Sequence, residues 1–230
     1  MNPIRNVIFD LDGTLVDSRS GIEYSVRAAL GAVFPGRSYP GLRVHIGIPI
    51  RRFFSEILDD PTSLLLDQLV RQFRASYDSI GWKQSWAYRG AAKMLSCLTR
   101  SGIGCFVATN KPRYATRCIL EHLNLHGFFR EVVTPDSWNH PFSSKEDMVS
   151  HIMRRYRLKA DEMIFVGDSR EDRSAADANG VPFGAVTYGY GDPLSESDGR
   201  DCYAIVSRLT EVADVLGVSA EDNHKVLEIQ

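Results

Sequence analysis

The sequence predicts an α/β fold with a doubly wound, mainly parallel sheet and a helical segment inserted near its start. Three observations support this prediction. Short apolar runs end in polar residues, helical patterns lie between most of these runs, and about 70 residues after the first run contain helical patterns only. Strands that alternate with helices in this way form an open sheet with helices on both faces.

Five runs have the composition of strands. The runs at 6–10, 103–110 and 162–168 are rich in β-branched and aromatic residues and contain few polar residues before their last positions. Strands of a parallel sheet have this composition because helices cover both of their sides. Further strand candidates lie at 130–135 and 183–189.

Helical patterns occupy the stretches between these runs and follow the last of them. In the pattern at 144–158, Ser144 is the expected N-cap. The expected core helices are 90–102, 113–125, 144–158, 174–180 and 208–218.

One segment interrupts the alternation of strands and helices. Helical patterns at 20–34, 49–60 and 62–81 follow one another without a good strand candidate between them. A connection from strand to helix needs only a few residues, so this length indicates an inserted helical domain. The expected parts are a core of residues 1–16 and 88–218, a helical domain of residues 17–87, and a loose tail of residues 219–230.

Composition narrows the class of protein. The formal charge of -2 and the pI near 6.3 give no support for binding to nucleic acid or to a membrane surface. The sequence has no signal core and no run of the roughly 18 apolar residues that a membrane span needs. Scattered cysteines are typical of free thiols in the cytoplasm. We therefore expect a cytoplasmic monomer or homodimer that acts on a small molecule. The cysteines are Cys97, Cys105, Cys118 and Cys202.

Oxygen-bearing residues follow three of the predicted strands. Asp10, Thr109 and Asp168 each lie at or directly after the end of an apolar run. Ligands of open α/β sheets bind outside the carboxyl ends of the strands, so we expect these side chains to meet on one rim. A single aspartate after a strand is often only a cap or turn residue, but three such strand ends together indicate a site.

The acidic residues expected at this rim need a counter-charge. Asp10, Asp12, Asp168 and Asp172 would repel one another and lose hydration if they clustered without a cation. Mg²⁺ prefers oxygen ligands, and Lys145 adds a further positive charge. Since a carboxylate is also a competent nucleophile towards phosphorus, the cluster suits phosphoryl chemistry.

Four segments resemble, in the usual order, the four motifs of the haloacid dehalogenase superfamily. They are "DLDGTLVDS", "VATNKP", "SSKEDMV" with Lys145, and "VGDSREDRSAADANG". The helical insertion lies where these enzymes carry a helical cap, so the resemblance covers the whole chain. It implies a Rossmann-like core with an inserted cap and a site that uses Mg²⁺.

The resemblance implies roles for the first two motifs. Asp10 resembles the nucleophile that forms an aspartyl-phosphate. Asp12 resembles the general acid and base that protonates the leaving oxygen and later activates water, and its backbone carbonyl would also bind Mg²⁺. Thr109 and Asn110 match the phosphate-binding second motif.

The last two motifs supply charge and metal ligands. Lys145 matches the lysine that offsets negative charge around the nucleophile and the phosphate. Relatives commonly have prolines after this lysine and this chain has none, so Lys111 stays open as the charge-balancing lysine. Asp168 matches a direct metal ligand, and Asp172 matches a ligand or its support. With Asp10 and Asp12 they form the expected Mg²⁺ site.

Asp12 favours phosphate chemistry, because the dehalogenases of the superfamily lack an acid at this position. General acid–base catalysis is worth roughly 10²–10⁴-fold in rate. "DGT" and "TNKP" are most similar to the phosphoglycolate phosphatase group. The resemblance thus implies a phosphatase for a small, phosphoglycolate-like monoester, while 5'-nucleotides and pyrophosphate stay open as substrates.

The helical insertion is expected to select the substrate. Residues 45–54 are the expected substrate-facing loop, where Arg51 or Arg52 would meet a substrate carboxylate or second phosphate, or be ordinary surface arginines. A phospho-receiver-like regulatory module is the alternative from another class, since it too has acids, a threonine and a lysine at strand ends. Receivers have neither such an insertion nor a segment that resembles "DLDGT".

Overall fold

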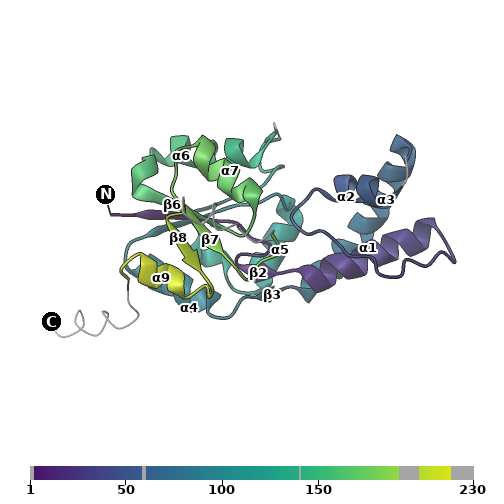
Figure 1. Cartoon of the computed structure of the whole chain (residues 1–230), viewed down its shortest axis with the longest axis horizontal. Helices are drawn as coiled ribbons and strands as arrows, with labels where there is room; N and C mark the ends of the chain where they lie inside the picture. The colour runs from purple at the N-terminus through teal and green to yellow at the C-terminus, as the bar shows by residue number, and fades with distance from the viewer. Residues whose placement is uncertain (1–2, 59–60, 140, 192–201, 219–230) are drawn as a thin grey trace.

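A six-stranded parallel sheet forms the centre of the molecule (Figure 1). It is seen in a computed structural model that describes residues 3–58, 61–139, 141–191 and 202–218. The strand order is β5-β4-β1-β6-β7-β8. The strands are β1 (Asn6–Phe9), β4 (Gly104–Ala108), β5 (Glu131–Val133), β6 (Met163–Gly167), β7 (Phe183–Val186) and β8 (Ala204–Val206). The prediction of a doubly wound α/β fold is confirmed.

β1 lies at the switch point of the sheet. The chain continues from it to β4 and β5 on one side, and then to β6, β7 and β8 on the other. Phe9 is level with Val107 of β4 and with Val166 of β6. Asp10 therefore leaves the central strand between the ends of β4 and β6, where open α/β sheets bind their ligands.

Helices cover both faces of the sheet because successive strand residues point to opposite sides. Val7 and Phe9 belong to the hydrophobic cluster on one face, and Ile8 belongs to the cluster on the other. The first face is covered by α4 (Ala91–Arg100), α5 (Arg113–His122) and α9 (Glu211–Val215), and the second by α6 (Lys145–Tyr156) and α7 (Arg170–Ala178). Short 3₁₀ turns lie at Gly81–Gln84 (η1), His126–Phe128 (η2) and Ala160–Glu162 (η3).

Three helices between β1 and β4 build a separate hydrophobic cluster beyond the carboxyl ends of the strands (Figure 1). They are α1 (Arg19–Val33), α2 (Ile50–Ile57) and α3 (Ser63–Tyr77), and we call residues 19–77 the helical segment. Phe53 and Phe54 of α2 are buried against α3. The rings of Phe73 and Tyr77 in α3 stack with their centroids 5.4 Å apart. The segment thus has an aromatic core of its own.

A short two-stranded sheet joins the two chain connections between the helical segment and the central sheet. β2 (Val16–Asp17) pairs antiparallel with β3 (Trp86–Ala87). The chain therefore leaves and re-enters the central domain at one place. Motion of the helical segment relative to the sheet would have to turn about this pair.

The sequence patterns located the long elements but missed three short strands. β2 and β3 have two residues each and β8 has three, which is too short for a periodic pattern. α7 begins at Arg170, before the expected start at residue 174, because Ser169 caps it. The expected tail, residues 219–230, lies outside the described residues.

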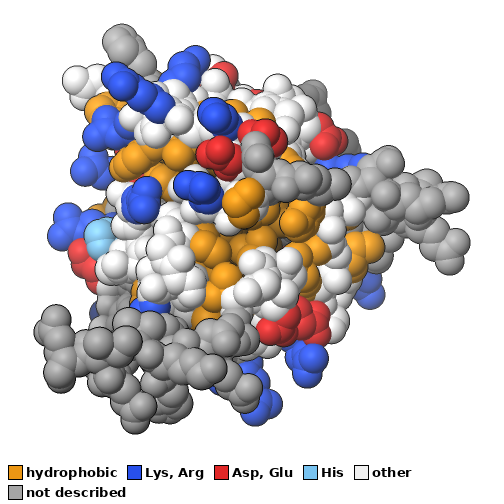
Figure 2. Space-filling model, turned by 90° about the vertical axis from the view of Figure 1, so that its left-hand side faces the viewer, with side chains coloured by type: hydrophobic (Ala, Val, Ile, Leu, Met, Phe, Trp, Pro, Cys, Tyr) orange, Lys and Arg blue, Asp and Glu red, His pale blue; other side chains and the backbone are white. Residues whose placement is uncertain are grey.

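The face that carries the amino ends of the strands lies opposite the helical segment. Hydrophobic side chains gather in the middle of this face, with lysine and arginine side chains around them (Figure 2). None of the helices that the structure describes combines the length and apolar character needed to span a bilayer.

The aromatic core of the helical segment predicts the effect of a truncation in α3. Leu69→Ala should lower the free energy of unfolding by about 2–5 kcal/mol, because Leu69 is fully buried in that core. Leu64→Ala in the same helix should change it by less than about 0.5 kcal/mol, because Leu64 is 80% exposed. Urea unfolding measures both, and equal losses would contradict the packing described.

Candidate active site

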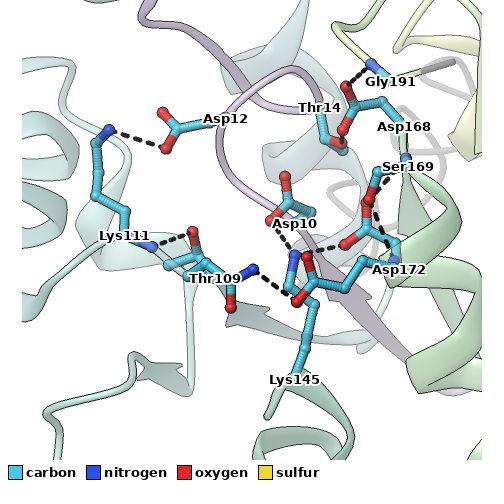
Figure 3. A network of polar contacts seen from close by, with 12 residues as sticks. Asp10, Asp12, Thr14, Thr109, Lys111, Lys145, Asp168, Ser169, Asp172 and Gly191 are labelled. Carbon is cyan, nitrogen blue, oxygen red and sulfur yellow. Dashed lines mark hydrogen bonds and ion pairs between the residues drawn. The ribbon is translucent and has the colours of Figure 1, made fainter. Parts of the chain in front are cut away.

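Three buried carboxylates meet where β1 and β6 end (Figure 3). One oxygen each from Asp10, Asp168 and Asp172 lies within 4.8 Å of the others. Asp10 follows β1, Asp168 follows β6, and Asp172 belongs to the first turn of α7. Because β1 and β6 are parallel neighbours and α7 starts directly after β6, the fold itself brings these acids together.

Lys145 lies between two of these carboxylates. Its Nζ donates to Asp10 Oδ1 at 2.9 Å and to Asp172 Oδ1 at 2.5 Å. Burial opposes the charge of the lysine, but the attraction of Asp10 and Asp172 outweighs burial and raises the pKa of Lys145. Lys145 is the first residue of α6, and the Ser144 hydroxyl caps that helix as expected. The start of α6 thus fixes a permanent positive charge inside the cluster.

A cap at the start of α7 orients Asp172. The Ser169 hydroxyl accepts the N–H of Asp172 at 3.2 Å, and Asp172 Oδ2 accepts the Ser169 N–H at 3.0 Å. Ser169 Oγ is also 2.6 Å from Asp172 Oδ2. With one oxygen held by Ser169 and the other by Lys145, the Asp172 carboxylate has little freedom to rotate.

The loop after β7 holds Asp168. Asp168 Oδ2 accepts the backbone N–H groups of Tyr190 at 2.6 Å and Gly191 at 2.9 Å. A Cβ atom at Gly191 would lie 1.8 Å from the Asp168 carbonyl oxygen. A Cβ atom at Gly13, whose φ is +93°, would lie 2.2 Å from Asp168 Oδ2. Both positions need glycine, because a side chain at either one would displace Asp168.

Asp12 occupies a different environment from Asp10, although only one residue separates them. Asp12 Oδ2 accepts Lys111 Nζ at 2.8 Å, and Asp12 Oδ1 accepts the Ser18 hydroxyl at 2.6 Å. Its side chain is turned away from the cluster of three acids (Figure 3). Lys145 and Lys111 therefore serve different aspartates: Lys145 bonds to Asp10 and Lys111 to Asp12.

Thr109 and Asn110 follow β4, the other neighbour of β1. Thr109 is buried, and its hydroxyl accepts the N–H of Lys111 at 3.2 Å. Asn110 Nδ2 donates to Glu171 Oε1 at 2.8 Å, which connects the end of β4 to α7. The sequence analysis did not anticipate this role of Glu171.

Tyr190 connects the loop after β7 to the start of α1. Its phenol donates to Asp17 Oδ1 at 2.5 Å and accepts the N–H groups of Ser18 at 2.7 Å and Arg19 at 3.2 Å. Ser18 is the N-cap of α1, but its own hydroxyl is bonded to Asp12. The phenol thus accepts two backbone N–H groups at the start of α1, where a helix leaves such groups without an intrahelical partner.

Sequence analysis missed this contact between Tyr190 and α1. The one sequence signal is the glycine pair in "TYGYG" at the end of a predicted strand, which indicates a close approach of backbone to another group. It does not name α1 as the partner, since 171 residues separate Tyr190 from Arg19.

A cavity of 580 Å³ lies between the rim residues and the helical segment. Arg51 borders it, but its guanidinium pairs with Asp67 and donates to Ser63 Oγ at 3.0 Å. Arg52 does not border it: this side chain is 69% exposed and pairs with Glu56 at 2.8 Å. Of the two arginines suggested for substrate selection, the geometry therefore leaves only Arg51 at the cavity.

Burial changes the acidity of the cluster. It raises the pKa of Asp10 well above its usual value, an effect that Lys145 opposes and that Asp172 and Asp168 increase. Burial, followed by the charge of Asp172, raises the pKa of Asp168 to about 6. Without a further cation, these carboxyl groups therefore bind protons more readily than exposed ones do.

The carboxylate oxygens of Asp10, Asp168 and Asp172 suit a hard divalent cation. Three ionised carboxylates and one lysine leave two negative charges unbalanced in a buried place. Carboxylate oxygens are the ligands that Mg²⁺ prefers, and its charge would offset this excess. The side chain of Asp12 does not belong to this group of three carboxylates. That the backbone carbonyl of Asp12 binds Mg²⁺ stays a prediction.

Comparison with known proteins identifies a family that has this fold. The family model of haloacid dehalogenase-like hydrolases matches residues 7–186, and the chain belongs to this family. A phosphoglycolate phosphatase of Photobacterium profundum is 31% identical over 224 residues, which are 93% of this chain and 96% of that protein. The resemblance to this family and to its phosphoglycolate phosphatases is confirmed.

Other relatives carry different names. The tyrosine-protein kinase PtkA of Mycobacterium tuberculosis is 32% identical over 186 residues, which are 80% of this chain but only 62% of the kinase. A 5'-nucleotidase of Pseudomonas aeruginosa is 29% identical over 81% of this chain and 84% of that protein. Among solved structures, a predicted phosphatase from Clostridium acetobutylicum has a TM-score of 0.79 and 30% identity and covers 93% of this chain and 98% of its own.

The raised pKa of Asp168 predicts how a cation changes stability with pH. Its pKa is about 6 in the folded protein against 3.8 for an ordinary aspartate, so the folded state loses stability as pH rises between these values. A bound cation removes that loss. Mg²⁺ should therefore raise the melting temperature more at about pH 7.5 than at about pH 5.

Thermal unfolding with Mg²⁺ and with a chelator at both pH values measures this difference. Asp168→Asn serves as the matched variant and should show a much smaller response to Mg²⁺ at the higher pH. A shift in wild type that is equal at both pH values would contradict the link to this carboxyl group.

The phenol of Tyr190 predicts a second change in stability. Tyr190→Phe should lower the free energy of unfolding by about 1 kcal/mol, because the Ser18 N–H loses its acceptor and the Asp17 carboxylate loses a donor. The Arg19 N–H keeps a second acceptor, Asp17 Oδ1 at 3.1 Å. Tyr24→Phe is the control, since Tyr24 lies in the same helix and is 49% exposed. Chemical denaturation that finds equal effects for both variants would contradict the capping role.

Proposed function

We propose that the protein is a Mg²⁺-dependent phosphatase that hydrolyses a small, phosphoglycolate-like monoester through an aspartyl-phosphate. The observation that carries this proposal is the separation of two aspartates: Asp10 bonds to Lys145, while Asp12 bonds to Lys111 and Ser18. A nucleophile and a general acid need different surroundings, and these two carboxyl groups have them. The family and its phosphoglycolate phosphatases lend further support.

In the first step Asp10 attacks the phosphorus atom of the ester. A bond forms between a carboxylate oxygen of Asp10 and phosphorus, and the bond between phosphorus and the ester oxygen breaks. Asp12, in its acid form, gives its proton to the departing oxygen, so that the product leaves as a neutral alcohol. Asp12 is then a carboxylate, and the ammonium group of Lys111 stabilises it.

In the second step water hydrolyses the aspartyl-phosphate. Asp12 accepts a proton from the water molecule whose oxygen attacks phosphorus, and the bond from phosphorus to Asp10 breaks. Phosphate is released and both side chains return to their first states. Thr109 and Asn110 bind the phosphoryl oxygens, and Lys145 offsets their charge.

The acidic cluster is the proposed Mg²⁺ site. Asp10 and Asp168 would hold the ion with the backbone carbonyl of Asp12, Asp172 would support them, and the ion supplies positive charge beside the phosphate. Lys145 alone leaves negative charge in excess, which is why the cluster needs the ion.

Residues 17–87 are the proposed cap, with residues 1–16 and 88–218 as the core domain. The separate aromatic cluster of the helical segment and the cavity below it support this division. Closing the cap would exclude bulk water from the aspartyl-phosphate. The pairing of β2 with β3 is the proposed hinge.

Nucleotide hydrolysis is a second candidate. A 5'-nucleotidase is among the relatives, and the cavity of 580 Å³ exceeds what glycolate fills. The stacked rings of Phe73 and Tyr77 border this cavity and offer an apolar wall. The receiver-like alternative has no such support, because the family match covers residues 7–186.

Release of phosphate from p-nitrophenyl phosphate and phosphoglycolate tests the mechanism. Asp10→Asn should reduce kcat to background, because the amide cannot form the acyl phosphate. Asp12→Asn should reduce kcat by roughly 10²–10⁴-fold, because proton transfer is lost. Asp214→Asn, an exposed aspartate on α9, is the control and should keep full activity.

The same assay separates the rival ideas. Chelation should abolish turnover, and Mg²⁺ should restore it. Stoichiometric labelling of Asp10 without turnover would favour the receiver-like alternative. Faster hydrolysis of 5'-nucleotides than of phosphoglycolate would favour the nucleotidase, and turnover that is independent of Mg²⁺ would overturn the metal site.

A further inference from the structure

Among the residues that the structure describes, four lysine or arginine side chains border the cavity. They are Lys111, Lys145, Arg51 and Arg74. Three of them already have a carboxylate partner: Lys111 pairs with Asp12, Lys145 with Asp10, and Arg51 with Asp67. Arg74 forms no ion pair with any residue that the structure describes, although it borders the cavity and is only half-buried.

Arg74 lies on the wall of the helical segment that faces the catalytic rim. It is in α3, one turn before Tyr77, whose ring lies 4.9 Å from Lys111 Nζ. Lys111 in turn bonds to Asp12 at 2.8 Å. Residues three apart on a helix have Cβ atoms about 5–6 Å from each other, so Arg74 and Tyr77 are neighbours on the face of α3 that borders the cavity.

The surroundings of Arg74 are mostly apolar. Ile22, Ile48, Val70 and Phe73 border the same cavity as Arg74, and the guanidinium carbon lies 5.8 Å from the centroid of the Phe73 ring. A cation that lies next to apolar surface and forms no ion pair can bind an anion, because the low local dielectric strengthens the attraction.

Arg74 acts electrostatically on an acidic neighbour. Asp78 lies one turn later in the chain, and Arg74 and Lys111 both lower the pKa of its carboxyl group, although burial, the larger effect, raises it. No ion pair forms between Asp78 and Arg74 among the described residues. Arginine has five N–H donors, so the fork of Arg74 remains available to a ligand.

We propose that Arg74 binds a second anionic group, a carboxylate or phosphate, on the leaving-group side of the substrate. This inference rests on the proposed phosphatase function and deepens it, because it names the residue that would recognise the second negative charge of such a substrate. The reacting phosphoryl group lies beside Asp10 and Lys145 at one end of the cavity, and Arg74 holds the second anion at the cap side. Arginine suits this task because its planar fork binds two oxygens at once.

A series of paired substrates tests the proposal. Each pair has an ω-carboxyalkyl phosphate and the corresponding carboxamide, which has the same shape without the charge, and the series begins with phosphoglycolate and glycolamide phosphate. At the spacer length that reaches Arg74, wild-type kcat/KM should be at least about tenfold higher for the carboxylate. Arg74→Gln should remove this preference and leave kcat/KM for the carboxamide within about twofold.

Arg52→Gln is the matched control. Arg52 is also an arginine of the helical segment, but it does not border the cavity and pairs with Glu56. This variant should keep the full preference for the carboxylate. Melting temperatures of both variants check that they fold, and Arg74→Lys should recover part of the preference because it restores the charge without the fork.

Two kinds of failure can be told apart. If wild type hydrolyses p-nitrophenyl phosphate but shows no preference for a carboxylate at any spacer length, the role of Arg74 is overturned and the phosphatase stands. The role is also overturned if Arg74→Gln keeps the wild-type preference. If wild type hydrolyses no phosphate ester in the presence of Mg²⁺, the proposed function itself fails.

Discussion

The buried ion pairs of Lys145 are the interaction on which the rest of the site depends. Asp10 and Asp172 lose hydration in the interior, and their repulsion adds to that cost. Removing one partner of a buried ion pair typically costs about 3–5 kcal/mol, because the other charge is left uncompensated. The lysine starts α6, and its two partners follow β1 and start α7. One ammonium group thus holds three elements together at the switch point of the sheet.

Lys111 forms a second lysine–aspartate ion pair in the same site. Lys111 pairs with Asp12 and also lies over the ring of Tyr77, so it contacts both the proposed acid and base and the helical segment. The sequence analysis left open which lysine balances the charge of the nucleophile. The geometry gives each of the two aspartates its own lysine, with Lys145 on Asp10. The two carboxyl groups of this short loop therefore have separate hydrogen-bond partners, although only one residue lies between them.

Much of the site could be predicted from sequence, because its main residues follow directly after strands. Asp10 and Asp168 carry this signal, since the strand before each of them is an unbroken apolar run. The contacts of Tyr190 and Glu171 carry no such signal, because their partners are distant in sequence and are chosen only when the chain folds. For the same reason β2 and β3 were missed: two residues cannot show a period, and each strand exists only because the other lies beside it.

The glycines around Asp168 limit which amino-acid substitutions this site can accept. Gly13 and Gly191 touch the carboxylate residue so closely that almost any substitution would move it. A new side chain at either of these two positions would therefore disturb Asp168 itself. The opposite wall of the cavity is built from helices with ordinary side chains, Arg74 among them, and a hydrophobic cluster of its own supports it. New specificities would arise by exchanging side chains on that wall, while the chemistry below it stays the same.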